Sequence, residues 1–439
     1  MATQPTLAMI PSGYKDGKLY SVLPSDGVGD FDVTRGSNAT RINKDGLIET
    51  VSGNTPRLNY PLIDGVVSGC PSLLLEPQDT TILAYTNSYT DSLWSKQGTT
   101  INSNTIIGLD GLLSASVLAR STGVLQRLNQ NMNLVIGNSY TISCYAKADA
   151  DIYLSVGLIY NAGNYAGSQF NLNTGVVTRT AFGGTNYNAF NPKIESTGNG
   201  WYRCSVTVQT GIIDSYPSFV PSDTLWTGSA FNVTNVGDGV NGLFIQRTMM
   251  TNSLFLSSYI DNTTSGATTR LADTANNAGN ASTFNDSEGV LMVEISDLYS
   301  GGGGVISINT GNNTQKIFLY LLNNTTVRYY AQGSGGVMFS DIPISSASNF
   351  NKIVFKYKSS DFAVWINGFE LYTNTSAITF SNLSSLDFHN PYLGGTENFY
   401  GKTKQLQYFN TALTDLELET LTSFTSFNAM ALAQNYKIQ

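Results

Sequence analysis

The chain has 439 residues, which is too long for one ordinary hydrophobic core and indicates two or three domains. Charged residues make up only 12% of it, whereas aromatic residues reach 11% and Gly, Ser, Thr and Asn are abundant. This composition favours strands and turns over helices, because short polar side chains compete for backbone hydrogen bonds. The formal net charge of −8 argues against nucleic acid as a partner, since phosphate binding requires clustered Lys and Arg.

The sequence also bears on membranes and secretion. No stretch approaches 18 consecutive apolar residues, so membrane insertion is not expected. The first residues, MATQPTLAMIPSGYKDGK, lack the basic and apolar regions of a secretion signal. An extracellular-style composition without such a signal is consistent with release inside an assembled particle, for example by lysis of the cell.

Residues 1–78 are crowded with turn signals, including Asp45-Gly46 and Asp64-Gly65, and the apolar runs between them are short. A segment of this kind does not easily form an independent core. We therefore expect it to bury its apolar residues against partner chains, as an attachment and oligomerisation segment.

Residues 79–262 have the rhythm of an antiparallel sandwich or jelly roll, with strand-like runs such as NSYTISCYAKAD, IYLSVGLIYN and WYRCSVTVQT between turns. In the third run, alternation places Tyr202, Cys204, Val206 and Val208 on the core face. Cys144 and Cys204 are interpreted as small buried hydrophobes, and a disulfide between them stays open if their strands are neighbours.

Residues 263–284 begin with a polar, turn-forming run and are predicted to be an interdomain linker. A second sandwich is predicted over 285–425, with Asn367-Gly368 as a hairpin turn. The run Thr414-Asp-Leu-Glu417 is a capping box and predicts a helix over 415–424, before a tail at 426–439. The expected fold class is thus all-β: two tandem antiparallel β-sandwich (jelly-roll) domains after an irregular N-terminal attachment segment, with one short C-terminal helix.

Several phrases resemble bacteriophage virion proteins of the head-spike, head-fibre and tail-associated kind. In that family a TR-x-N-x-x-G run precedes N-x-P-R-x-x-Y, then an LLLE turn and a Trp-x-Lys phrase, and a Thr-Arg-hydrophobic-Ala-Asp run ends the jelly roll. The chain carries these phrases as TRINKDG, NTPRLNY, LLLEPQ, WSK and TRLAD, and the matching positions include Thr40, Arg41, Arg57, Glu76 and Arg270. The usual Thr-Asn after the Gln is replaced here by Thr-Thr-Ile, and Asp261 replaces a common Pro.

The last unit, with FKYKSSDFAVWINGFEL, resembles the concanavalin-A-like lectin/glucanase sandwich. Together the two resemblances imply a virion protein, a head fibre or spike, attached to other virion proteins through its N-terminal segment. They further imply a homo-oligomer that adheres to cell-surface or mucus glycans through many weak contacts. A tail receptor-binding protein and a polysaccharide depolymerase stay open as alternatives.

No catalytic residue, metal site or cofactor is expected. The single histidine, His389, has no partner motif for a zinc site or a Ser-His-Asp site. Glu294 and Asp297 have the wrong spacing for a glycosidase carboxylate pair on one face of a strand. The Gly-rich runs at 301–304 and 333–336 lack the Lys-Ser/Thr of a phosphate loop and are predicted to be hairpin tips.

Two kinds of polar site remain as candidates. Asp26, Asp30 and Asp32 do not have the spacing of a calcium-binding loop, so a solvated turn is the interpretation. The runs IYNAGNYAGSQ and GGTNYNAFNP, in contrast, combine aromatic rings with amides and hydroxyls, as sugar-binding loops do. The predicted ligand-binding residues are Tyr160, Tyr165, Tyr187 and Phe190.

Overall fold

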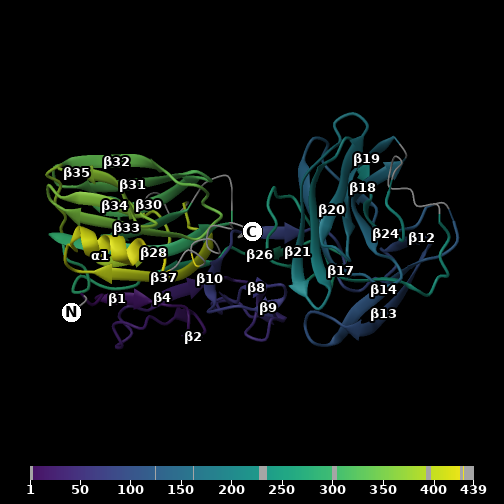
Figure 1. Cartoon of the computed structure of the whole chain (residues 1–439), viewed down its shortest axis with the longest axis horizontal. Coiled ribbons are helices and arrows are strands. Elements are labelled where there is room, and N and C mark those ends of the chain that lie inside the picture. The colour runs from purple at the N-terminus through teal and green to yellow at the C-terminus, as the bar shows by residue number, and fades with distance from the viewer. Residues whose placement is uncertain are drawn as a thin grey trace.

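The computed structural model describes residues 3–123, 125–161, 163–226, 235–298, 304–391, 397–425 and 429. The chain forms two β-sandwiches, seen as the two lobes of Figure 1, with the N-terminal strands running below and between them. Over these residues the fold is all-β with one short helix, as the sequence predicts. No described helix has the length and apolarity needed to span a bilayer.

The first sandwich packs two large antiparallel sheets. One has the order β13-β14-β25-β17-β22-β21, with β11 on β25, and the other β12-β15-β24-β18-β19-β20. Their bounds are β11 Asp79–Thr81, β12 Ser95–Gln97, β13 Thr99–Ile107, β14 Leu113–Arg120, β15 Arg127–Asn129, β17 Ser139–Lys147, β18 Tyr153–Asn161, β19 Asn164–Asn171, β20 Val176–Gly183, β21 Asn188–Gly198, β22 Trp201–Gln209, β24 Pro217–Ser222 and β25 Gly242–Thr251. A small ladder joins β16 (Met132–Asn133) to β23 (Asp214–Ser215).

The predicted core face of β22 is confirmed. Cys204, Val206 and Val208 have no exposed surface, and Tyr202 packs against the same core. Cys144 and Cys204 lie opposite each other on β17 and β22, and both are free buried thiols. Burial raises the pKa of both, so they behave as apolar groups, as the sequence indicates.

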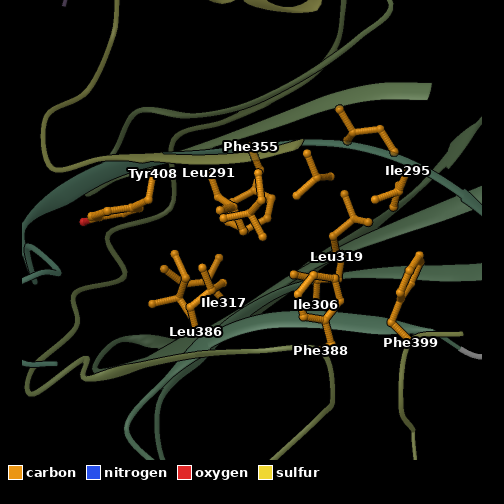
Figure 2. Packing of buried hydrophobic residues seen from close by; sticks show 14 of the residues in the cluster. Leu291, Ile295, Ile306, Ile317, Leu319, Phe355, Leu386, Phe388, Phe399 and Tyr408 are labelled. Carbon is orange, nitrogen blue, oxygen red and sulfur yellow. The ribbon is translucent and has the colours of Figure 1, made fainter. Parts of the chain in front are cut away.

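The second sandwich also packs two sheets. One has the order β35-β34-β33-β28-β37-β10-β7, with β1 on β37, and the other β32-β31-β30-β29-β36. Their bounds are β1 Leu7–Met9, β7 Leu58–Asn59, β10 Ser72–Leu75, β28 Glu288–Asp297, β29 Val305–Asn309, β30 Lys316–Asn323, β31 Thr326–Gly333, β32 Gly336–Pro343, β33 Asn351–Lys358, β34 Phe362–Ile366, β35 Phe369–Asn374, β36 Ser385–Asp387 and β37 Gly401–Phe409. Figure 2 shows Leu291, Phe355 and Tyr408 from one sheet facing Ile306, Ile317 and Leu386 from the other.

Strands β1, β7 and β10 of the N-terminal segment belong to this second sandwich, whereas Ile48 of the same segment packs against the first. Leu7 and Leu73 pair with β37 through their strands, and Phe31 and Val33 are buried in the same core. The expectation that these apolar residues need a partner chain is therefore wrong, because they leave water inside their own chain. The remaining short strands are β2 Tyr14–Lys15, β3 Lys18–Leu19, β4 Phe31–Thr34, β5 Ala39–Ile42, β6 Ile48–Val51, β8 Leu62–Ile63, β9 Val66–Val67, β26 Thr268–Arg270 and β27 Thr274–Asn276.

The chain crosses between the sandwiches twice. Residues 72–81 run from β10 in the second sandwich to β11 in the first, and residues 257–276 return through β26, which pairs with β11, to β27, which pairs with β4. The predicted linker at 263–284 thus contains two paired strands. The segment lies between the two sandwiches, and its backbone pairs with β11 through β26 and with β4 through β27.

A buried ion cluster lies where these two segments cross, and we define it as Arg35, Arg57, Glu76, Arg270 and Asp273. Nitrogens of Arg57 lie 2.5 Å from a Glu76 oxygen and against Asp273, and Arg35 lies 2.8 Å from Asp273. Arg270 lies 3.2 Å from Glu76. Burial alone would raise the pKa of Glu76, but Arg270 and Arg57 lower it.

Two local signals at the C-terminal end are confirmed. Asn367 and Gly368 have φ of 51° and 93° and form the turn between β34 and β35, which only residues tolerant of positive φ allow. Helix α1 (Asp415–Thr422) begins with the capping box of Thr414 and Glu417. The tip at 333–336 joins β31 to β32 as predicted, while residues 301–303 and most of the tail at 426–439 lie outside the described residues.

Candidate functional site

The outer face of the sheet formed by β29 to β32 carries the best-defined candidate site. Strand register sets side chains from β30, β31 and β32 in three parallel rows on this face, because side chains alternate along each strand. The rows are Lys316, Gln332 and Val337; then Phe318, Tyr330 and Phe339; then Tyr320, Arg328 and Asp341.

The middle row is aromatic on all three strands, and we call Phe318, Tyr330 and Phe339 the aromatic row. The rings of Phe318 and Tyr330 stack with centroids 4.5 Å apart and planes 8° from parallel. Phe339 is 57% exposed, although it is a large apolar side chain on an edge strand. Val337 on the same strand is 55% exposed, so the two side chains add apolar surface of the kind that, when contiguous, marks interaction sites.

Cations flank the aromatic row on both sides. The ammonium of Lys316 lies 5.6 Å from the centroids of both Phe318 and Tyr330, and the Arg328 guanidinium lies 5.0 Å from that of Phe339. Arg328 is fixed by Asp341, whose oxygen lies 2.7 Å away. That hydrogen bond raises the pKa of Arg328 and lowers that of Asp341, so both stay charged.

A hydrogen-bonded chain closes the other end of the site. The Lys316 ammonium donates to Asn390 at 3.0 Å, and the Asn390 amide donates to Glu397 at 2.6 Å. Burial lowers the pKa of Lys316, and Glu397 acts in the opposite direction. Tyr330 donates to Gln332 at 2.9 Å, which orients the Gln amide over the sheet.

A cavity of about 300 Å³ lies at this surface, and Phe339 is outside its lining. The lining residues are Asn313, Lys316, Phe318, Tyr320, Arg328, Tyr330, Gln332, Asn390 and Glu397. A volume near 300 Å³ is at the lower end of the range for small-molecule sites. Phe318 and Lys316 are buried, so the accessible part of this surface consists of the half-buried ring of Tyr330, the exposed ring of Phe339, the Arg328 cation, a carboxylate and several amides. Such a site suits a ligand with an apolar face and a rim of hydroxyl groups, rather than a purely hydrophobic ligand.

The structure separates the four ligand-binding residues predicted in the first sandwich. Tyr165 and Tyr187 are buried in two different hydrophobic clusters, so their rings are taken by protein contacts. Tyr165 packs edge-on against Trp226, at 6.1 Å between centroids. This corrects the expectation for both residues, since a buried ring cannot stack on a sugar.

The other two predicted residues keep accessible surface. Tyr160 is 41% exposed and stacks on Tyr216, with centroids 6.1 Å apart and planes at 21°. Phe190 is half-buried on β21, opposite Thr207 of β22. Sequence reasoning missed the aromatic row, although the alternation of Phe318 with Tyr320 in KIFLYLLN is a signal of an aromatic outer face.

The carboxylates considered for catalysis have other contacts. Glu294 accepts a hydrogen bond from Gln405 at 2.8 Å and lies 3.4 Å from Lys404. Asp297 is three residues further along the same strand, which places it on the opposite face. The ring of His389 is hydrogen-bonded to Asn276 at 2.9 Å.

The three aspartates of the N-terminal segment are held separately. Asp26 accepts from the backbone of Val28, and Asp30 accepts from the backbone of Ser21. Asp32 pairs with Lys18 at 2.6 Å, and its pKa is lowered by that bond. Within the described ranges, no group of three His, Cys, Asp or Glu residues is arranged to hold a metal ion.

Comparisons with known proteins add the following. No family model and no curated protein matches the chain. Among solved structures it is similar to the CBM40 of a Ruminococcus gnavus IT-sialidase bound to α2,3 sialyllactose, with 18% identity over 33% of this chain and 86% of the other, and a TM-score of 0.29. It is also similar to a heptameric SAP-like pentraxin from Limulus polyphemus, with 15% identity over 32% and 71% and a TM-score of 0.28.

A third similar structure is domain 4 of AbnA, a GH43 extracellular arabinanase from Geobacillus stearothermophilus, in complex with arabinotriose. That match has 15% identity over 39% of this chain and 84% of the other, with a TM-score of 0.28. These likenesses are too distant to assign a ligand or a site to this chain. The candidate site therefore rests on its own geometry.

Proposed function

We propose that the protein binds glycans, and that the outer face of the sheet around β31 is the binding surface. The observation that carries this proposal is the aromatic row, with Lys316 and Arg328 on either side and the amides of Gln332 and Asn390 within the same cavity. A pyranose ring has one or two faces of C–H groups, which suit the negative face of an aromatic ring. Its hydroxyls then meet the amides and charged groups at the edges of the row.

The experiment is glycan-array binding of the full chain, followed by titration calorimetry with the best oligosaccharide. Tyr330→Ala removes the central ring of the aromatic row, and we expect binding to weaken at least tenfold. The matched control is Phe369→Ala, which removes a ring that is 69% exposed on β35 of the other sheet. Equal loss in both variants, or undiminished binding by Tyr330→Ala, would contradict this location of the site.

Binding without catalysis is part of the same proposal. It is supported by the engagement of Glu294 with Lys404 and Gln405 and by the opposite-face placement of Asp297. Reducing-sugar release from a bound polysaccharide tests it. Release that disappears in Glu294→Gln or Asp297→Asn would replace the binding role with that of a depolymerase.

A bacteriophage virion role, as a head fibre or spike, is a second proposal, which the resemblance to such proteins supports. Arg57, Glu76, Arg270 and Asp273, from three of the motifs that carry this resemblance, converge in the ion cluster. The motifs therefore describe one structural junction, as expected of a family module. Antibody labelling of particles in electron micrographs tests this: label over the capsid supports a head fibre, label at the tail a receptor-binding protein, and absence of label refutes both.

A further inference from the structure

A second, larger cavity lies between the two sandwiches. Its volume is about 780 Å³, and its lining comes from the N-terminal segment, from β21 and β22 of the first sandwich, and from β28 and β37 of the second. Small-molecule sites typically have volumes of 300–1,000 Å³ and occur preferentially at domain interfaces. This cavity is separate from the cavity at the aromatic row, because the two share no lining residue.

Most charged groups around this cavity already have partners. Arg41 pairs with Glu49, Glu76 belongs to the ion cluster, and Arg203 donates to the Ser257 carbonyl at 2.7 Å. Asp297 has contacts of its own. Arg41 and Glu76 are thus paired with opposite charges, whereas Arg203 keeps its positive charge, because its partner is a neutral carbonyl and its Nε has no hydrogen-bond partner.

Three charged groups remain: Lys193 and Glu195 on β21, and Lys402 on β37. Within the described part of the chain, none of the three forms a hydrogen bond or an ion pair through its side chain. Two ammonium groups thus face one carboxylate, which leaves an excess of one positive charge. Lys402 is half-buried whereas Lys193 and Glu195 are exposed, so its ammonium is the least solvated of the three.

Hydrogen-bonding groups surround these charges. Hydroxyls and amides reach the cavity from both sandwiches and include Asn191, Ser205, Thr207, Asn324 and Ser348, and the ring of Tyr60 lines it from the N-terminal segment. We propose that this interdomain cavity binds a saccharide that carries one carboxylate. The ligand carboxylate pairs with Lys402, and the sugar hydroxyls hydrogen-bond to the amide and hydroxyl side chains of the cavity walls. This inference is independent of the glycan surface at the aromatic row.

The surroundings of Lys402 give the physical reason. Burial lowers the pKa of this ammonium, and the carboxylates of Glu195 and Glu76 offset part of that effect. A half-buried charge without a close partner is only partly solvated, and a ligand carboxylate stabilises it by forming a charge-assisted hydrogen bond. A neutral sugar offers no such gain, so the site discriminates by charge.

The test is calorimetric titration of the full chain with D-glucuronate, with D-glucose as the neutral probe. We expect saturable binding of glucuronate that is at least tenfold weaker in Lys402→Met. Lys404→Met is the matched control, because Lys404 lies two residues along the same strand, pairs with Glu294 and does not line the cavity. Its binding should equal that of the unmodified chain.

Glu195→Gln provides a gain that misfolding cannot imitate. Removing the only uncommitted carboxylate should strengthen glucuronate binding several-fold, since repulsion of the ligand is relieved. The inference is overturned if glucuronate does not bind, if glucose binds equally well, or if Glu195→Gln has no effect. It is also overturned if Tyr330→Ala, rather than Lys402→Met, abolishes binding, because the anion would then occupy the aromatic row.

Discussion

Replacing Arg57 by Met should destabilise the protein more than any surface charge replacement. The Arg57 side chain has no exposed surface, and it pairs with Glu76 and Asp273, whose side chains are 4% and 2% exposed. It also donates to the Thr40 carbonyl at 3.2 Å and to Ser258 at 2.9 Å. Arg57→Met leaves two buried carboxylates with fewer cations around them.

The expected loss in the free energy of unfolding depends on the cations that remain beside Glu76 and Asp273. Removing one partner of a buried ion pair typically costs about 3–5 kcal/mol, because the other charge is left uncompensated. Arg35 still neutralises Asp273 and Arg270 still lies near Glu76, so we expect the lower end, about 3 kcal/mol. The control is Lys18→Met, which removes a pair whose side chains are 37% and 40% exposed and should cost about 0–1 kcal/mol.

Guanidinium unfolding followed by tryptophan fluorescence measures both variants. Trp94 and Trp201 are buried in the first sandwich and Trp365 in the second, so the signal reports on both. The free energy is compared for the first transition, since two sandwiches need not unfold in one step. A loss below about 1 kcal/mol for Arg57→Met would refute the view that this cluster fastens the crossing segments.

Three further predictions concern the same framework. The lowered pKa of Glu76 means that its contribution to stability is complete above its unfolded-state pKa of 4.5 and is lost as the pH falls below it, so acid unfolding curves should be flatter below pH 4.5 in Glu76→Gln. A Cβ at Gly65 would lie 1.7 Å from the Gly198 backbone, so Gly65→Ala should detach the β8–β9 hairpin and speed its amide exchange; Gly69→Ala, with a similar positive φ but open space, should not. Thr414→Ala removes the N-cap of α1 and should lower stability by about 1 kcal/mol in thermal unfolding, whereas Thr420→Ala, at an exposed position within the helix, should have little effect.

Local sequence signals predicted the strands, the β34–β35 turn and the start of α1, because each depends on residues a few positions apart. The ion cluster depends on Arg57, Glu76 and Asp273, which only the fold brings together. The motifs marked Arg57 and Glu76 as positions shared with the resembling family, but they did not show that the two side chains pair with each other.

The candidate site was harder to predict for a similar reason. Tyr165 lies in β19 and not in a loop, and its strand turns the ring against Trp226. The aromatic row forms only when β30, β31 and β32 pair in this register. The alternation within one strand predicts which side of the sheet a residue lies on, but not which residues of the neighbouring strands lie beside it. Predicting whether a side chain is buried or exposed therefore requires knowing which elements cover each face of its sheet.

The pairing of β1 with β37 also has a consequence for biosynthesis. Leu7 lies opposite Tyr408, so the first strand of the chain must wait for one of the last before its hydrogen bonds can form. At about 5–20 residues per second, translation of the intervening chain takes tens of seconds. During that interval the first sandwich can fold, whereas β1 and one edge of β10 lack their partner strand β37. The nascent chain therefore carries its greatest exposure to aggregation until the ribosome has completed the final sheet.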